Sequence, residues 1–484
     1  MADRHRDRGG MVGFLDEARV TMIWFLAGHE WRVLKASTIV RLVIAVFAIA
    51  LVVASALGTA RADAERATIA RFAVPVPHFQ PVTGMIGDRA NLNVRADFAA
   101  NERGYLALLP PAPLSALAIG QGDVYPNYIK VTARSLDALV SGDQIEHPLA
   151  VASGQFDAAF VVLFLYPLLI CAVSFDLTAT ERDRGTLRMV LAQPVTLGDV
   201  VAGKMIVRVF KLLIPMLLIT VGTAALFSPT GADFWPRAML WVAAIVVYGA
   251  VWHGIAMVVN ARGFSAPANA LILAGIWLLF AVVGPSCVNL LIAIRYPMPS
   301  RVEAAVQARA ATQDATVQGS RQLGQFLQDH PTSGNVGREG MRQFALLQAQ
   351  RDQKVAERLQ AVEATFNAQL EKQQRLASWL SVLSPTMIAQ GVLLDVAGTS
   401  TERFDHFRVE AASFQQRWKS YFEPRVLDAA TLTPAEFAAA PSFEFVEEPF
   451  TLTARRVAMP IIVMAIFAAV LVAIGFRSYR GYQL

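Results

Sequence analysis

Six long apolar segments constrain the fold of this chain more than any other feature. Each has close to the 20 or so residues that an α-helix needs to cross the hydrocarbon core of a bilayer. Hydrophobic residues make up 55% of the 484 residues and charged residues 17%, against about 25% charged in an ordinary globular protein. We therefore expect a mainly α-helical, polytopic membrane protein, with transmembrane helices at residues 40–60, 156–175, 205–227, 238–259, 270–294 and 458–476.

Basic residues beside these segments predict the orientation of the chain. Lysine and arginine are enriched in the cytoplasmic flanks of membrane helices. Residues 1–39 and 176–204 each carry several, whereas the connection between the third and fourth spans has only Arg237. We therefore expect a cytoplasmic N-terminus, a cytoplasmic loop at 176–204 and a cytoplasmic tail at 477–484. Arg455 and Arg456, which precede the last span on the outer side, are an exception.

This orientation leaves two large extracytoplasmic segments, residues 61–155 and 295–457. Proline and glycine in the first predict turns and short strands. The second predicts a helical domain, in which a helix of about 60 Å runs from about Gly340 to Leu380. Its apolar residues recur at three- and four-residue steps, so one stripe should pack on a partner. The residues of this stripe are Val355, Leu359, Val362, Phe366 and Leu370.

The cytoplasmic N-terminus predicts a helix at the membrane surface. Residues 14–36 mix aromatic and aliphatic side chains with charges, a composition that suits an amphipathic helix in the interface. The residues concerned are Phe14, Leu15, Met22, Ile23, Trp24, Phe25, Trp31 and Val33. Basic side chains near the span ends, Arg41, Lys204, Arg208 and Lys211, are expected to extend to the same interface.

The stretch Gly198 to Met205, GDVVAGKM, resembles a phosphate-binding loop. Such a loop needs a serine or threonine after the lysine to bind magnesium, and a strand that leads into it. Here Met205 follows Lys204, and the downstream residues are those of a membrane helix. We therefore expect that the chain does not hydrolyse ATP and binds no cofactor.

Other chemistry has little support in the sequence. Cys171 and Cys287 lie in apolar segments, and the seven histidines show no metal-binding spacing. We expect no metal, no catalytic residue and no nucleic-acid partner. Two polar residues lie inside predicted spans, His253 and Asn289. Each is either a functional intramembrane site or a residue that forms a hydrogen bond between helices.

The loop between the second and third spans carries the most informative motif. It reads FDLTATERDRGTLRMVLAQPVTLGDVVAGK. It resembles the intracellular loop of ABC-2-type transporter permeases, in which an ERxxGTL motif is followed by a proline and a short helix that ends in Gly-Lys. Two further stretches extend the resemblance, GQFDAAFVVLFLYPLLICAVSFDLT upstream and LSPTMIAQGVLLDVAGTSTERFDHF downstream. The chain is similar to the branch with a large extracytoplasmic helical insert, as in copper-enzyme-maturation and gliding-motility permeases.

The resemblance implies a permease subunit in the bacterial cytoplasmic (inner) membrane. It would pair with a second copy or a paralogue, and two cytoplasmic ATPase subunits would bind ATP and magnesium. A periplasmic partner is a further expectation. The coupling residues implied are Glu181, Arg182, Asp183, Arg184, Gly185, Thr186, Leu187 and Pro194. The four charges would pair with the ATPase surface, Gly185 would form a turn, and Thr186 would cap a helix over residues 187–192.

Three functions remain open at this point. The first is an ABC permease that moves substrate outward or acts on it at the outer face. The second is a mechanotransmission or scaffold subunit that relays ATPase motion to an outer partner without passing substrate. The third is a proton-coupled transporter that uses His253, although internal repeats and multiple buried charges are missing. The loop could also be solvated, with arginines that only set the topology.

Overall fold

The computed structural model describes most of the membrane part of the chain and much of the outer part. The described residues are 4–73, 94–120, 127–134, 136–137, 156–193, 195–227, 231, 233–297, 368–428 and 430–480, with isolated positions between 306 and 365. The apolar stripe predicted at Val355, Leu359, Val362 and Phe366 lies outside these residues.

Six helices in the described residues are long and apolar enough to cross a membrane, which confirms the predicted class of fold. Four are continuous α-helices: α2 (Thr38–Ala73), α8 (Leu197–Phe227), α9 (Phe234–Asn260) and α17 (Phe450–Arg480). The second span joins α4 (Ala158–Phe160), the π-helix η2 (Val161–Leu165) and α5 (Tyr166–Ser174). The fifth joins α10 (Ala266–Leu278), the π-helix η3 (Leu279–Val283) and α11 (Gly284–Arg295).

The sequence Gly284-Pro285 could be expected to break the fifth span, but the span continues through both residues. The Gly284 amide donates to the Leu279 carbonyl, which closes the π-helical turn. Pro285 then falls in the first turn of α11, where its missing N–H removes no bond from the new helix.

Large aromatic side chains fill the middle of the membrane bundle. Trp241, Tyr248 and Trp252 on α9 are all fully buried. A π-helical turn releases backbone carbonyls from the usual ladder, and aromatic side chains of α9 and α10 supply the donors. The Tyr248 hydroxyl donates to the Leu163 carbonyl in η2 at 2.8 Å. The Trp277 indole donates to the neighbouring Phe164 carbonyl at 3.0 Å.

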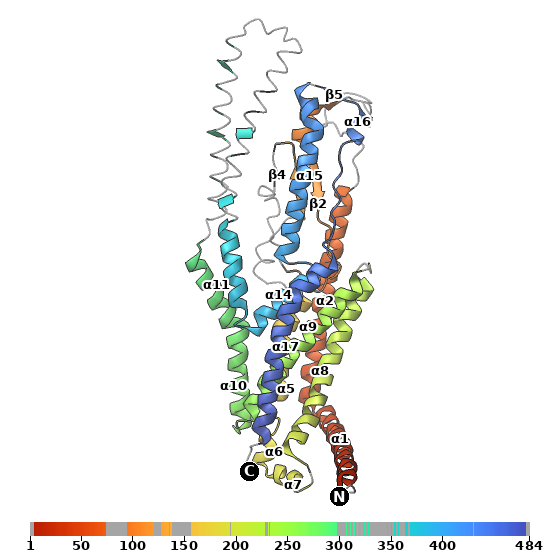
Figure 1. Cartoon of the computed structure of the whole chain (residues 1–484), viewed down its shortest axis with the longest axis vertical. Helices are drawn as coiled ribbons and strands as arrows, with labels where there is room; N and C mark the ends of the chain where they lie inside the picture. The colour runs from red at the N-terminus through yellow and green to blue at the C-terminus, as the bar shows by residue number, and fades with distance from the viewer. Residues whose placement is uncertain are drawn as a thin grey trace.

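The part of the chain outside the bundle, which we call the outer domain after its predicted location, stands at one end of the bundle (Figure 1). Its longest described helix is α15 (Thr401–Leu427), preceded by the apolar helix α14 (Pro385–Ala397) and followed by α16 (Pro434–Ala438). The first outer segment contributes η1 (Phe98–Arg103) and a three-stranded antiparallel sheet. The sheet consists of β2 (Tyr105–Leu108), β3 (Tyr128–Val131) and β4 (Leu136–Asp137). The predicted turns and short strands are confirmed in the described part of this segment.

Aromatic side chains of α15 form the core of the outer domain. Phe407, Phe414, Trp418 and Phe422 follow helical spacing and are almost fully buried. They pack against η1, β2 and β3. A second, two-stranded pairing joins β1 (Val94–Arg95) to β5 (Thr431–Leu432). Segments that are far apart in the sequence therefore share one hydrophobic core.

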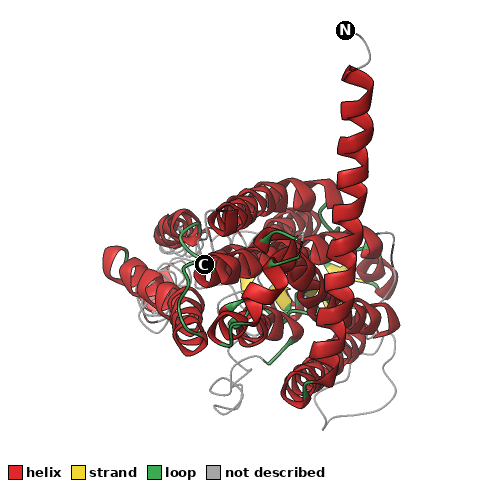
Figure 2. Ribbon diagram, turned by 90° about the horizontal axis from the view of Figure 1, so that it is seen from below, coloured by secondary structure: helices red, strands yellow, loops and turns green. Residues whose placement is uncertain are grey.

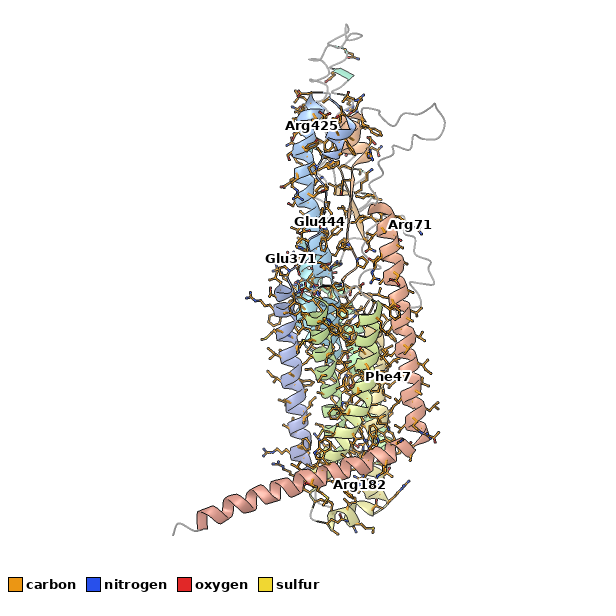
Figure 3. All side chains as sticks on the ribbon, turned by 90° about the vertical axis from the view of Figure 1, so that its right-hand side faces the viewer. Phe47, Arg71, Arg182, Glu371, Arg425 and Glu444 are labelled. Carbon is orange, nitrogen blue, oxygen red and sulfur yellow. The ribbon has the colours of Figure 1, made fainter. Side chains whose placement is uncertain are left out.

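Helix α1 (Arg4–Ala36) lies across the opposite end of the bundle and extends beyond it (Figures 2 and 3). It approaches α8 closely at Gly203, where an added Cβ would lie 3.1 Å from the Ile23 carbonyl oxygen. Trp24, Phe25 and Trp31 remain exposed on its surface. This arrangement has the form expected of an interfacial helix, and the interfacial placement stays a prediction.

Candidate functional site

The loop that carries the ERDRGTL motif folds into two short helices at the end of the bundle where both termini lie (Figure 1). These are α6 (Ala179–Asp183) and α7 (Thr186–Leu191). Gly185 separates them with a φ of 75°, a left-handed conformation that favours glycine. The tight turn predicted at Gly185 is therefore present, and we refer to residues 176–193 and 195–204 as the coupling segment.

Side chains from α8 and α9 donate hydrogen bonds to backbone carbonyls at the end of α5 and at the start of the coupling segment. A helix leaves its last carbonyls without intrahelical donors, and α5 ends at Ser174. Arg208 donates to the Val173 carbonyl at 2.7 Å, and Asn260 donates to the Ser174 carbonyl at 2.9 Å. Lys204 donates to the Leu177 carbonyl at 2.7 Å. Two of these three donors, Arg208 and Lys204, are cations, which the dipole at the C-terminus of a helix favours.

Arg208 also links this point to the N-terminal helix. Its guanidinium contacts the Glu30 carboxylate of α1 at 2.7 and 2.9 Å. The Arg208 and Glu30 residues are 5% and 6% exposed, so the pair is buried. Lys204 and Arg208, expected from the sequence to extend to the membrane interface, are both buried in the protein and bind backbone carbonyls. One residue therefore joins α1, α5 and α8.

Two of the four charges in the ERDR motif face the protein itself. The Glu181 carboxylate forms an ion pair with Lys204 at 2.7 Å. Arg182 donates to the Gly263 carbonyl at 2.6 Å and to the Phe264 carbonyl at 3.0 Å. Both carbonyls follow the end of α9. These two side chains position the coupling segment on the ends of α8 and α9.

Leu187 packs the coupling segment into a hydrophobic cluster. It is 1% exposed and belongs to a cluster with residues from α8, α9 and α17. The members of this cluster are Leu177, Leu187, Leu197, Val201, Met205, Met257, Ala261 and Tyr479. A displacement of α7 would therefore act on three membrane helices at once.

The remaining residues of the motif form an outward surface. Asp183, Arg184 and Arg188 are exposed, and Met189 is 74% exposed beside them. Mixed charge around an exposed apolar side chain is a composition suited to a protein partner. Pro194 lies outside the described residues.

The capping role expected for Thr186 is wrong. Gly185 occupies the N-cap position of α7, and Thr186 is the first helical residue. Its hydroxyl instead donates to the Glu181 carbonyl at 3.1 Å. Thr186 therefore connects the two short helices, because the turn at Gly185 brings the end of α6 within reach.

The stretch Gly198 to Met205 forms no loop, because it lies in the first turns of α8. A phosphate-binding loop presents several backbone amides to the ligand before its helix begins. Here α8 already begins at Leu197. Lys204, the residue that would reach the phosphates, binds Glu181 and the Leu177 carbonyl.

The two intramembrane polar candidates lie in different surroundings. His253 is 3% exposed, and its Nδ1 donates to the Gly249 carbonyl of its own helix at 2.8 Å. Its Nε2 has no hydrogen-bond partner in the described part of the chain. The expectation that His253 forms a hydrogen bond between helices is wrong for this contact, which lies within α9. Asn289 lies on the exposed side of α11 and bonds to no described residue, so it connects none of the described helices.

Two asparagines that sequence reasoning missed contribute more than His253 or Asn289. Asn260 accepts from the Leu177 amide at 3.1 Å through its Oδ1. The Asn269 side chain, fully buried on α10, donates to the same oxygen at 3.1 Å. Their positions at the ends of predicted spans, next to the coupling segment, are the sequence signal that could have identified them.

Arg456, one of the two arginines that do not fit the predicted orientation, forms ion pairs with residues next to the outer domain. Arg456 forms ion pairs with Asp395 at 3.1 Å and with Glu448 at 2.8 Å. Its charge is therefore neutralised by these acidic residues.

These features define a multi-pass membrane protein with a polar, ordered segment at one end and a folded domain at the other. Residues 301–446 match the family model described as a domain of unknown function, DUF3526. That match covers part of the outer domain, including α14 and α15. No curated protein matches the chain.

Proposed function

We propose that this chain is the membrane-spanning subunit of an ABC transporter of the ABC-2 type, powered by separate cytoplasmic ATPase subunits. The observation that carries the proposal is the construction of the coupling segment. Its inward face is fixed by Glu181, Arg182 and Leu187, and its outward face presents Asp183, Arg184, Arg188 and Met189. A rigidly seated surface of this kind can pass the movement of a bound partner into the membrane helices.

The proposal includes the orientation and the direction of transport. The coupling segment and both termini would face the cytoplasm of a bacterial inner membrane, and the outer domain would face the periplasm. ATP-driven closure of the ATPase pair would change the relative populations of two states of a permease dimer. Substrate would move outward or be handled at the outer face. The chain itself would hold no ATP and no magnesium.

A binding experiment with charge reversal tests the coupling surface. The full chain would be purified with the candidate ATPase, and Arg184→Glu with Arg188→Glu would be compared with Arg262→Glu. Arg262 is also exposed at this end of the bundle, at the end of α9. The double reversal should reduce complex formation by at least about tenfold, the size expected when attractive rim charges become repulsive. Equal assembly of both variants, or ATP hydrolysis by the lone chain, would refute the proposal.

Labelling tests the orientation separately. A single cysteine at Gln193, in a variant with Cys171 and Cys287 replaced, would be treated with an impermeant maleimide. Gln193 is exposed on the coupling segment. Modification should require permeabilised cells, whereas modification in intact cells would place the segment outside and remove the basis of the proposal.

A relay subunit that passes no substrate is a second candidate, favoured by the outer ion pairs. Arg456 at the start of α17 binds Asp395 and Glu448, and Arg237 on α9 donates to the Val396 carbonyl at 3.3 Å. Two membrane helices are thereby tied directly to the outer domain. A wide polar path at the centre of the assembled dimer favours transport, and a dry sealed interface favours the relay.

A further inference from the structure

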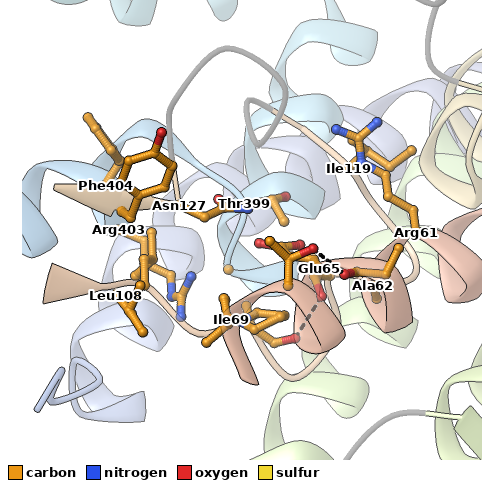
Figure 4. Close-up of a pocket in the computed structure, with 18 of the residues that line it drawn as sticks. Arg61, Ala62, Glu65, Ile69, Leu108, Ile119, Asn127, Thr399, Arg403 and Phe404 are labelled. Carbon is orange, nitrogen blue, oxygen red and sulfur yellow. Dashed lines mark hydrogen bonds between the residues drawn. The ribbon is translucent and has the colours of Figure 1, made fainter. Parts of the chain in front are cut away.

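A cavity of about 460 Å³ lies where the extension of α2 meets the outer domain (Figure 4). One wall is a single face of α2, from Gly58 to Ile69. The others come from the first outer segment and from the turn between α14 and α15. Apolar side chains at Leu108, Leu109 and Phe404 line it beside charged ones. A cavity of this size can hold a small molecule or one end of a larger one.

Several polar groups that line this cavity have unused bonding capacity. The Glu65 carboxylate lies between Arg403 and Arg61 in Figure 4 and accepts a hydrogen bond from no described residue. Arg403 is 11% exposed at its side chain. Its Nε and Nη2 donate to Glu447 and to the Pro110 carbonyl, while its Nη1 has no described partner. The Thr399 hydroxyl is buried and also lacks a described partner.

Charged side chains of both signs meet at the cavity. Arg61, Glu65 and Arg403 line it, and Glu447 pairs with Arg403 from behind. A ligand with a single charge would match only one of the two signs at a half-buried site, where an unmatched charge is costly. A ligand that carries both charges can match both, because an ammonium group can meet Glu65 and an oxyanion can meet Arg403. Arginine suits oxyanions of carboxylate or phosphate geometry.

The position of the cavity agrees with such a ligand. The apolar part of α2 ends at Ala60, and the next residue, Arg61, lines the cavity. Glu65 lies one turn further out, about 6 Å along the helix axis. This is the level at which lipid head groups meet a membrane protein.

We propose that this cavity binds a zwitterion in which an ammonium group and an oxyanion are a few bonds apart. Glu65 receives the ammonium, and Arg403 donates through Nη1 to the oxyanion. The ligand is either the head group of a zwitterionic phospholipid or a soluble molecule with the same two charges. The inference does not depend on the ATPase-coupled function, because binding can be measured with this chain alone.

The test uses the full chain in nanodiscs that contain only phosphatidylglycerol. Calorimetric titration with glycerophosphoethanolamine should show binding, and glycerophosphoglycerol, which lacks the ammonium, should not bind. In a second arm, lipids retained from nanodiscs of mixed phosphatidylethanolamine and phosphatidylglycerol are quantified by mass spectrometry. Binding of the soluble zwitterion indicates that the site accepts free ligand. Enrichment of phosphatidylethanolamine, with no binding of the soluble zwitterion, indicates a lipid site. Absence of both overturns the proposal.

Three variants locate the site. Glu65→Gln should lower affinity or enrichment at least about tenfold, since it removes the only acidic side chain that lines the cavity among the described residues. Asp63→Asn is the matched control, because Asp63 is on the same helix, 61% exposed at its side chain and paired with Arg66. Thr68→Trp fills the cavity from an exposed position and should also abolish binding. Unchanged binding in Glu65→Gln or Thr68→Trp would contradict the proposal, provided that thermal unfolding shows the variants folded.

Discussion

The two ends of the membrane bundle hold their charged residues in different ways. At the coupling end, Arg208 and Lys204 each meet one carboxylate and cap backbone carbonyls of the second span. At the outer end, arginines share several carboxylates, as Arg456 does with Asp395 and Glu448. In the described part of the chain, Lys204 and Arg208 each form an ion pair with a single carboxylate, and Arg208 and Glu30 are both buried, whereas Arg456 pairs with two carboxylates. A single substitution should therefore do more damage at the coupling end.

Removal of Arg208 should have the largest effect. Arg208→Met leaves Glu30 buried without its partner and leaves the Val173 carbonyl without its donor. Loss of one member of a buried ion pair costs roughly 3–5 kcal/mol. Thermal unfolding in detergent would measure the loss, with the exposed Arg188→Met as the control. The double variant Glu30→Leu, Arg208→Met should recover part of the stability, and equal melting of Arg208→Met and Arg188→Met would contradict the comparison.

The next largest effect on stability is expected at the close contact between α1 and α8. An added Cβ at Gly203 would lie 3.0 Å from the Leu26 Cβ and 3.1 Å from the Ile23 carbonyl oxygen. Gly222 on the same helix has nothing within 4 Å. Alanine is favoured over glycine in a helix by about 1 kcal/mol, so Gly222→Ala should be neutral or stabilising.

Gly203→Ala should instead separate α1 from α8, with a cost relative to Gly222→Ala of about 1–3 kcal/mol, as for overpacking. The difference in unfolding temperature between the two variants measures it. Identical behaviour would show that α1 can shift without cost, and then α1 could not be a fixed part of the coupling end.

A smaller effect is expected at the outer end, and it depends on pH. Burial is the main reason that the pKa of Asp395 lies above its ordinary value. The charges of Glu402 and Glu448 also raise this pKa, whereas the hydrogen bond from Ser400 and the charge of Arg456 lower it. The folded chain therefore holds this proton more tightly than the unfolded chain. The resulting stabilisation is complete below the ordinary carboxyl pKa of about 4 and is lost as pH rises through the folded value.

Asp395→Asn removes this titration while Glu448 still pairs with Arg456. The stability of the wild type relative to Asp395→Asn should fall as pH rises from about 4 to neutrality. Unfolding temperatures of both proteins across this range test it, with the exposed Asp63→Asn as the control. If the stability of the wild type relative to Asp395→Asn rises with pH instead, the ion pair between Asp395 and Arg456 outweighs burial.

The helices of the bundle could be predicted from the sequence, but their contacts could not. Apolar length identifies a span, and glycine between short helices identifies the turn at Gly185. Whether a charged side chain extends to the interface or turns inward depends on neighbours from distant segments. Arg208 meets Glu30, which precedes it by 178 residues, and no local pattern reveals that pair. The cavity beside Glu65 is likewise formed by three separate parts of the chain.

The smallest effect is expected away from both ends, in a purely local contact. Thr433 and Glu436 form a capping box at the start of α16, in which the Thr433 side chain accepts from the Glu436 amide at 3.3 Å. Replacement of a helix N-cap by alanine costs typically about 1 kcal/mol. Thr433→Ala should therefore lower stability slightly, and Thr433→Ser should retain it, because serine keeps the hydroxyl.

Chemical denaturation of the full chain can measure this difference if the outer domain unfolds together with the bundle. The Trp418 core connects α15 to η1 and β2, and Arg456 and Arg237 connect the domain to α17 and α9, so a single transition is expected. A separate early transition that responds to Thr433→Ala but not to Arg208→Met would show that the outer domain unfolds independently. In that case the two ends are not mechanically joined, and a relay of motion between them loses its structural basis.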